Sequence, residues 1–389
     1  MGVETRGRDK EWESERGRER EGRGLMGKEG TDGQLPVLGW VRDNIALMVV
    51  VGLLSVLPFV IAILDGQSIA GLLANESGNA KFIQGLMIEV FILAVFAISY
   101  DLVLGITGLL SLGHAMFFAV GAYLTGIMLK SFGWSLLPTV GLVIVAGVLQ
   151  ALLFSVVLPR VRGLTFALVT LGIASVFDIS IKTRELAEYT GADVGLQAIP
   201  RPDFLNPATQ RMRFYFVTLA FALLVYLLYR RFVDSPTGRV CIAIRENEGR
   251  ARMLGYNTFY FKLAALIVAA VTAGLAGVFN TLYKPIVSPE IASVFFTVDA
   301  LLMILIGGMG TLSGAMVGAA TYRLMEFYLH KWFGESATVI LGSVYIVLVL
   351  FVPYGLIGTW RLRGLQWRQG WLRRLRRLRG EEGEGGDYV

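Results

Sequence analysis

The chain has 389 residues, of which 54% are hydrophobic and only 17% are charged, and its mean hydropathy is +0.60. About a quarter of the residues in soluble domains are charged, so this composition excludes an ordinary soluble domain and predicts a polytopic integral membrane protein. The formal net charge of +6 is attributed to charge asymmetry across a membrane and not to nucleic-acid binding. The single cysteine, Cys241, excludes an intramolecular disulfide bond.

Residues 1–40 differ from the rest of the chain. They are rich in Arg, Glu and Gly, their charges nearly balance, and hardly any apolar residue occurs before Leu25. Such a segment cannot bury a core, so we predict a disordered, charged N-terminal extension. No run near Met1 has the shape of a cleaved signal peptide, and the first apolar run is long enough to be a membrane span.

A membrane-spanning helix needs about 20 mainly apolar residues. By this measure residues 41–358 predict an all-α transmembrane domain with about eight to ten such helices. They are expected near 45–64, 82–104, 108–129, 136–158, 163–182, 213–230, 260–282, 294–309, 311–329 and 336–353. The sequence Gly307-Gly-Met-Gly310 separates the eighth segment from the ninth, and it is either a turn outside the membrane or a break within it.

Basic residues in short loops mark the cytoplasmic side of a membrane protein. Arg160 and Arg162 share one loop, four Arg lie at 234–257, and eight lie between Arg361 and Arg379. A set of about ten spans with both termini in the cytoplasm places all three groups there, and the loops 65–81 and 184–212 then face outward. Residues 359–389 are expected to form a basic and then acidic cytoplasmic tail, whose segment 371–379 anchors on anionic lipid or, as the alternative, makes a regulatory contact.

The polar island 234–257 lies between two apolar segments. It opens with a Pro/Gly turn, continues with helix-compatible residues and stops at Gly255. Apolar and basic residues are interleaved in it: Ile242, Ile244, Ala251 and Leu254 alternate with Arg239, Arg245, Arg250 and Arg252. This pattern predicts a short amphipathic helix that docks on another protein or, as the alternative, lies on the membrane surface.

Catalysis is not expected. The chain has two histidines, His114 and His330, and no cluster of Cys, His, Asp and Glu at metal-ligand spacing. It also lacks the Gly-x-x-x-x-Gly-Lys-Ser/Thr sequence of a nucleotide-binding loop, and the glycines at 307–310 favour close helix packing over phosphate binding. We therefore predict a protein that is not an enzyme and binds no metal or cofactor itself. ATP, if it is used, would be hydrolysed by another subunit.

A glycine-rich segment at 105–123 joins two apolar runs. Its glycines weaken a helix there, while Thr107, Ser111 and His114 supply polar groups. Transporters use such broken helices to present polar groups to a substrate, but tight packing of glycine-rich helices explains the pattern equally well. For His114 alone, a structural hydrogen bond is favoured. A short echo, Gly108-Leu-Leu-Ser111 and Gly310-Thr-Leu-Ser313, would suit an internal duplication.

Charged residues within apolar segments are costly and therefore informative. They are Glu89, Asp178, Lys182 and Asp299, with Arg323 and Glu326 nearer a helix end. Asp178 and Lys182 are four residues apart, and Arg323 and Glu326 are three apart, so each pair is expected to form an ion pair on one helical face. Binding of a coupling ion is the alternative.

Several motifs together resemble the LivM-type permease subunit of branched-chain amino acid ABC importers, over residues 85–355. They are Gly105-x-x-Gly108-x-x-Ser111-x-Gly113-His114 with Phe117 and Gly121-Ala-Tyr123; Thr165-Phe-Ala-Leu-Val-Thr170-Leu; Thr190-Gly191 with Gly195-Leu196 and Ile199-Pro200; Gly307-Gly-Met-Gly310-Thr-Leu-x-Gly314; and Gly238-Arg239-x-x-x-Ala243-Ile-Arg245-Glu246-Asn247 with Ala251 and Gly255. The last motif is similar to the coupling segment that fits into a groove on the ATPase.

The resemblance implies a multi-pass permease of the bacterial cytoplasmic (inner) membrane that imports leucine, isoleucine or valine. Its partners would be a second, homologous permease, two ATPase subunits that hold ATP and Mg²⁺, and an extracytoplasmic substrate-binding protein. The residues implied for ATPase coupling are Gly238, Arg239, Ile242, Ala243, Arg245, Glu246, Asn247, Ala251, Leu254 and Gly255. The residues implied for the translocation pathway are Gly105, Thr107, Gly108, Ser111, Gly113, His114, Phe117, Tyr123, Thr165, Thr170, Gly307 and Gly308.

Within the coupling segment, Arg239, Arg245 and Glu246 are expected to dock on the ATPase. Ile242, Ala251 and Leu254 are expected to tie the helix to the membrane domain.

The sequence leaves alternatives open for the substrate and for the energy source of transport. Where the family often has a Gly-Gly pair in the outer loop, this chain has Thr190-Gly-Ala-Asp193, and permeases for urea and short-chain amides are also similar to it. An ion-coupled secondary transporter would instead need an essential intramembrane acid, Asp178 or Asp299, and would work as one polypeptide. A passive channel is a weaker third reading.

Overall fold

The structure is a computed structural model that describes residues 36–66, 71, 78–161, 163–351 and 355–359. The basic tail and all but the end of the predicted N-terminal extension lie outside these residues. Residues 36–40, expected to belong to the extension, instead form the first turn of helix α2, Pro36–Leu64. Proline suits the first turn of a helix because its missing N–H would be unpaired there anyway.

The chain divides into two compact units, residues 1–57 and 58–389, and each is described by itself. The described part of the first unit is the greater part of α2. The helices of the second unit are α4 (Asn79–Asp101), α5 (Ala115–Lys130), α6 (Leu136–Ser155), α7 (Leu164–Ile181), α8 (Ala187–Thr190), α9 (Arg211–Asp234), α10 (Pro236–Met253), α11 (Thr258–Tyr283), α12 (Val294–Gly307), α13 (Leu312–Phe333) and α14 (Ala337–Phe351). The fold is therefore all-α, as predicted.

Each predicted span coincides with a helix, but not all of these helices are full spans. By length and composition, six described helices can cross a membrane, and a seventh span results if α12 and α13, which are bent by 114° to each other, count as one. The break at 308–311 thus lies between two apolar helices, an arrangement that fits both a turn outside the membrane and a break within it. The predicted eight to ten spans require counting α5, with 16 residues, and α14, with 15.

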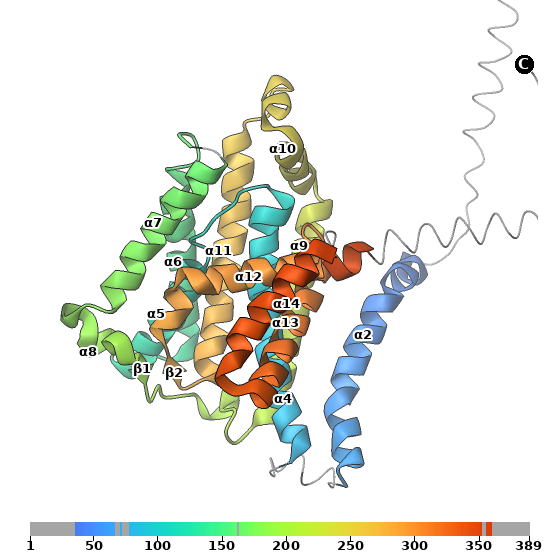
Figure 1. Cartoon of the computed structure of the whole chain (residues 1–389), viewed down its shortest axis with the longest axis vertical. Coiled ribbons are helices and arrows are strands. Elements are labelled where there is room, and N and C mark those ends of the chain that lie inside the picture. The colour runs from blue at the N-terminus through green and yellow to red at the C-terminus, as the bar shows by residue number, and fades with distance from the viewer. Residues whose placement is uncertain (1–35, 67–70, 72–77, 162, 352–354, 360–389) are drawn as a thin grey trace, which may run out of the picture. The chain divides into compact units, whose positions relative to one another are not determined.

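The core of the second unit is built around α11, which packs against α4, α5 and α6 (Figure 1). The α5–α11 contact is close because glycines lie in it: a Cβ at Gly121 would meet the carbonyl of Gly274, and one at Gly277 would meet the carbonyl of Phe118. Small residues allow such close helix packing inside membranes. The contact fixes α5 although α5 is short.

The loop 182–210 is fastened to the ends of α5 and α11 opposite α10 (Figure 1). Its strand β1, Leu196–Gln197, pairs antiparallel with β2, Ile286–Val287. The Lys130 ammonium donates to the carbonyl of Gln197 at 2.9 Å, and the Arg201 guanidinium donates to the carbonyl of Tyr283 at 3.0 Å. The two ends of the helix bundle are thus distinct, one carrying α10 and the other the β1–β2 pair.

Candidate functional site

The polar island forms helix α10, as predicted. Pro236 stands in the first turn, and the Ser235 hydroxyl caps the helix by accepting from the Gly238 amide at 3.3 Å. Cys241 and Ile244 are buried, so one face of the helix packs against the membrane domain. Arg239 and Glu246, two of the three predicted docking residues, are exposed on the other face, as is Ala243 of the predicted coupling set.

The island differs from the expected single helix because it is kinked at Asn247. This residue has an extended backbone, with φ −159° and ψ 98°, and its side chain accepts from the Arg250 amide at 2.9 Å. It therefore ends one helix and caps the next, as Asn commonly does. The expectation that Leu254 ties the helix to the membrane domain is wrong: the kink redirects the second part, and Leu254 is 72% exposed while Ala251 is buried.

A charged cluster around Glu248 fastens the second part of α10 to the start of α11. One oxygen of the Glu248 carboxylate accepts from Lys262 at 2.7 Å, from Arg252 at 2.7 Å and from Thr258 at 2.9 Å. Burial opposes ionisation of Glu248, but the hydrogen bond and charge of Lys262, followed by Thr258 and Arg252, lower its pKa to about 2. The sequence analysis missed this cluster, although the i, i+4 spacing of Glu248 and Arg252 was a signal.

Arg245 does not point away from the membrane domain. Its guanidinium donates to the carbonyl of Gly105, just after α4, and its side chain lies against Gly108 and Gly310. The charged end of Arg245, which was expected to dock on the ATPase, is thus bonded to the membrane domain, because a carbonyl oxygen at the helix break accepts from it.

Asp101, the last residue of α4, is an acidic residue of an apolar helix that the sequence analysis missed. Its side chain is fully buried, and one carboxylate oxygen accepts from the Gly310 amide at 2.7 Å. The hydrogen bond joins residues 209 positions apart. The available signal was an acid at the end of a long apolar run, four residues before Gly105.

The predicted pathway residues around His114 are packed between helices. The His114 ring is fully buried, bonds the Ser99 hydroxyl at 2.8 Å and lies 4.9 Å from the Tyr100 ring and 5.3 Å from the Phe117 ring, measured between centroids. This is the structural hydrogen bond favoured for His114. Its other ring nitrogen has no partner among the described residues.

Backbone amides of the same segment are bonded by hydroxyls from distant helices. Thr170 of α7 accepts from the Leu112 amide at 3.2 Å, and Thr297 of α12 accepts from the Ala115 amide at 2.9 Å. The segment between η1, the π-helix Leu102–Ile106, and α5 is thus fixed by side chains that satisfy its free donors. This arrangement favours the packing interpretation of the glycine-rich segment.

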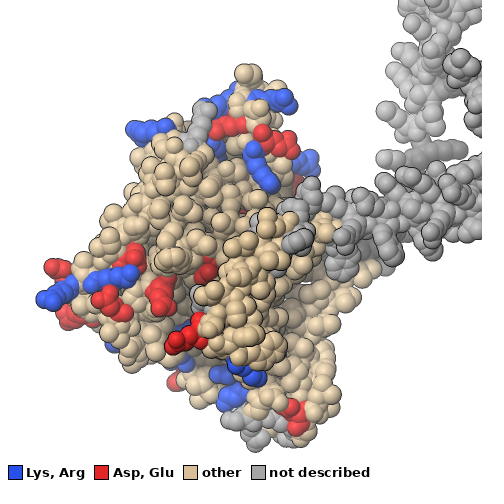
Figure 2. Space-filling model, in the orientation of Figure 1, with Lys and Arg blue, Asp and Glu red and all other residues tan. Residues whose placement is uncertain are grey.

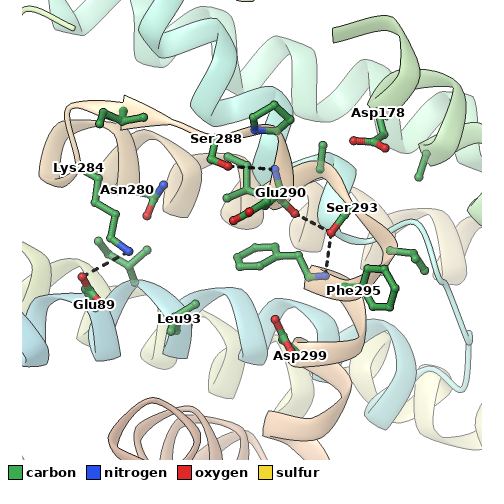
Figure 3. Close-up of a pocket in the computed structure, with 18 of the residues that line it drawn as sticks. Glu89, Leu93, Asp178, Asn280, Lys284, Ser288, Glu290, Ser293, Phe295 and Asp299 are labelled. Atoms are coloured by element: carbon green, nitrogen blue, oxygen red, sulfur yellow. Dashed lines mark hydrogen bonds and ion pairs between the residues drawn. The ribbon is translucent and has the colours of Figure 1, made fainter. Parts of the chain in front are cut away.

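A cavity among the described residues has a volume of about 890 Å³ and lies among α4, α7, α11, α12 and α13 (Figure 3). None of the predicted pathway residues lines it. Instead the predicted intramembrane charges do: Glu89, Asp178, Lys182, Asp299, Arg323 and Glu326. Asp193, Lys284 and Glu290 add charges that the sequence analysis did not place there.

The charges of the cavity are partly paired. Lys182 and Asp178 form the expected ion pair at 2.9 Å, and Arg323 and Glu326 form theirs at 2.7 Å. Glu89 pairs with Arg323 and, at 3.4 Å, with Lys284 (Figure 3). The pairing expected from sequence spacing is therefore confirmed, although Glu89 extends it across three elements.

Two of the described carboxylates of this cavity, Asp299 and Asp178, form no ion pair with Arg323. Asp299 lies in α12 and carries a hydrogen bond with the Tyr322 hydroxyl, and Figure 3 shows its carboxylate directed into the cavity. One oxygen of Asp178 is buried and has no partner among the described residues. A cavity with cations and spare carboxylate oxygens can hold a ligand that carries both charges.

Comparison with known proteins gives the family. Residues 82–352 match the family described as the permease component of branched-chain amino acid transport systems. The chain is 28% identical over 290 residues to the high-affinity branched-chain amino acid transport system permease protein LivM of Salmonella typhimurium, covering 68% of this chain and 67% of that protein, and equally similar to LivM of Escherichia coli K12.

A second kind of relative is LivH of Escherichia coli K12, a permease protein that is also named for high-affinity branched-chain amino acid transport. It is 23% identical over 282 residues, covering 68% of this chain and 91% of that protein. No solved structure matches the chain. On the match over residues 82–352, together with its set of apolar helices, the chain belongs to the family of permease components of branched-chain amino acid transport systems.

Proposed function

We propose that this chain forms, with a second homologous permease, the membrane pathway of an ATP-driven importer for leucine, isoleucine and valine. Its similarity to both LivM and LivH, two permease proteins of such systems, supports the pairing of two related chains. The cytoplasmic membrane with both termini inside is the location that the distribution of basic residues supports.

The charged cavity is the observation that carries the substrate proposal. Charges inside a membrane domain are costly to keep, and a zwitterionic amino acid offers partners for both signs at once. Both signs of charge line this cavity, among them Lys182, Lys284, Asp178 and Asp299. Urea and short amides carry no charge, so they give these residues no counterion. We therefore favour branched-chain amino acids over urea or amides.

The exposed face of α10 supports an ATPase as the cytoplasmic partner. Arg239, Ala243 and Glu246 are exposed there, and Leu254 is exposed beyond the kink. On the face drawn in Figure 2, Lys, Arg, Asp and Glu side chains lie at the α10 end, and others lie at the left and at the bottom of the view. Two ATPase subunits would carry ATP and Mg²⁺, and an extracytoplasmic binding protein would deliver the substrate to the opposite end.

Reconstitution tests the proposal. The chain is placed in proteoliposomes either alone or with the second permease, the ATPase subunits and the binding protein, and uptake of labelled leucine is measured with unlabelled leucine, urea or acetamide as competitor. We expect uptake only in the complete complex and only with ATP. Unlabelled leucine should inhibit this uptake, whereas urea and acetamide should not. Uptake by the chain alone along an ion gradient would contradict the proposal, and inhibition by urea would move the substrate to the urea class.

A further inference from the structure

We propose that Arg245 couples α10 to the two helix breaks of the membrane domain, through a cluster of Asp101, Gly105, Gly108, Arg245 and Gly310 that we call the latch. The inference rests on the proposed function, in which α10 receives motion from an ATPase. It adds the route by which that motion enters the cavity walls.

The Arg245 side chain fills the space between two glycines. A Cβ at Gly108 would lie 3.0 Å from Cγ and 3.1 Å from Cα of Arg245, and one at Gly310 would lie 2.7 Å from its Nη1. The same Nη1 donates to the carbonyl of Gly105. An added Cβ would make a tight contact at Gly108 and would push on the end of the Arg245 side chain at Gly310, so both glycines allow Arg245 to approach closely.

The two glycines also share a backbone conformation. Gly108 has φ +76° and Gly310 has φ +78°, values that other residues rarely adopt. These are the first residues of the repeated sequences Gly108-Leu-Leu-Ser111 and Gly310-Thr-Leu-Ser313. Each copy of the short echo noted in the sequence therefore begins with a glycine of positive φ that lies against Arg245.

Asp101 is the buried member of the latch and links the end of α4 to Gly310. It accepts from the Gly310 amide, its second carboxylate oxygen is buried without a partner among the described residues, and it lies within the field of the Arg245 charge. A buried carboxylate needs such compensation. Directly after it α4 widens into the π-helix Leu102–Ile106, a form common at functional sites.

The latch joins the helices that line the charged cavity. Helix α4 contributes Glu89 to that cavity, α12 contributes Asp299, and α13 contributes Arg323. The end of α4 and the break between α12 and α13 are the places that Arg245 and Asp101 hold together. Motion of α10 would therefore move all three cavity walls together, whereas an α10 without the latch would move without them.

The test compares Arg245→Gln and Asp101→Asn with the control Arg231→Gln, an exposed arginine at the end of α9. Each variant complex is assayed for retained ATPase subunits, for basal ATP hydrolysis and for its stimulation by leucine-loaded binding protein. We expect both latch variants to retain the ATPase subunits and basal hydrolysis, while stimulation falls by about tenfold, a typical allosteric coupling. The control should behave as wild type.

The double variant sharpens the test. If the two residues act as one unit, Arg245→Gln with Asp101→Asn should lose no more stimulation than either alone. Full stimulation in both single variants, or additive losses, would overturn the latch. If Asp101→Asn fails to fold, Arg245→Gln decides, because Arg245 lies at the surface. A wild-type chain that never retains ATPase subunits would instead contradict the proposed function.

Discussion

The charged cavity and the latch are both polar regions within an apolar helix bundle, but they satisfy their polar atoms in different ways. The cavity uses long side chains such as Glu89 and Lys284, which form ion pairs around about 890 Å³ of space. The latch uses backbone groups and glycines, so that Arg245 and Asp101 touch main chain directly. The ion-pairing side chains of the cavity have space in which a ligand can replace one partner. The closely packed contacts of the latch have no such space, so we assign them the transmission of α10 motion.

The largest effect on uptake is expected from disturbing the close contact between Gly310 and Arg245 in the latch. Gly310→Ala forces a side chain into the left-handed region at about 1–2 kcal/mol and towards the Arg245 guanidinium. We expect leucine uptake by the complete complex to fall by more than about tenfold, within the range of allosteric coupling. The control is Gly342→Ala, where nothing lies within 4 Å of an added Cβ. Normal uptake by Gly310→Ala would contradict the latch, because it would show that the contact with Arg245 tolerates a side chain at position 310.

The next effect concerns the cavity. Asp299→Asn removes one negative charge that faces the cavity, so we expect the concentration of leucine for half-maximal uptake to rise about tenfold, the equivalent of ~1.4 kcal/mol. Retention of the ATPase subunits should not change. Glu335→Gln, an exposed acid outside the cavity, serves as control. An unchanged half-maximal concentration would remove Asp299 from substrate recognition.

A smaller effect on stability is expected at the Glu248 cluster. The pKa of Glu248 is lowered to about 2 in the folded protein, below its unfolded value of about 4.3. The stabilisation is thus complete above about pH 4.3 and is lost as the pH falls through 2. Glu248→Gln should lower the melting temperature of the purified protein by the same amount at pH 8 and pH 6. A difference between these two pH values would contradict the assignment, and exposed Glu246→Gln is the matched control.

The smallest effect is expected at Lys182. Its ion pair with Asp178 is partly exposed, with side-chain exposures of 36% and 22%, and such i, i+4 pairs contribute about 0.3–0.5 kcal/mol. Lys182→Gln should therefore leave the melting temperature nearly unchanged. A large loss of thermal stability would mean that the cavity charges stabilise the fold. It would contradict the role in ligand binding that we give them.

What the sequence predicted well is local. Apolar runs of sufficient length located the helices, and ion pairs three or four residues apart, such as Arg323 with Glu326, formed as expected. The amphipathic island at 234–257 was also predicted, and it forms α10. Family motifs pointed to the permease family, which the match over residues 82–352 confirmed.

Contacts between residues far apart in the chain could not be predicted from the sequence. Asp101 and Gly310 are 209 residues apart, and Arg245 and Gly105 are 140 apart. The kink at Asn247 turned Leu254 outward against its hydrophobic pattern, because a single extended residue changes which face is buried. The cavity likewise assembles charges from several helices, so its lining could not be read along any one of them.

The most direct test of the account is the number of leucine molecules imported per ATP hydrolysed. It is measured in proteoliposomes that hold equal amounts of ATPase subunits with wild-type, Arg231→Gln or Arg245→Gln permease. The account predicts the wild-type ratio for Arg231→Gln and a ratio about tenfold lower for Arg245→Gln, because hydrolysis continues while the cavity walls no longer follow α10. Equal ratios in all three complexes would contradict it.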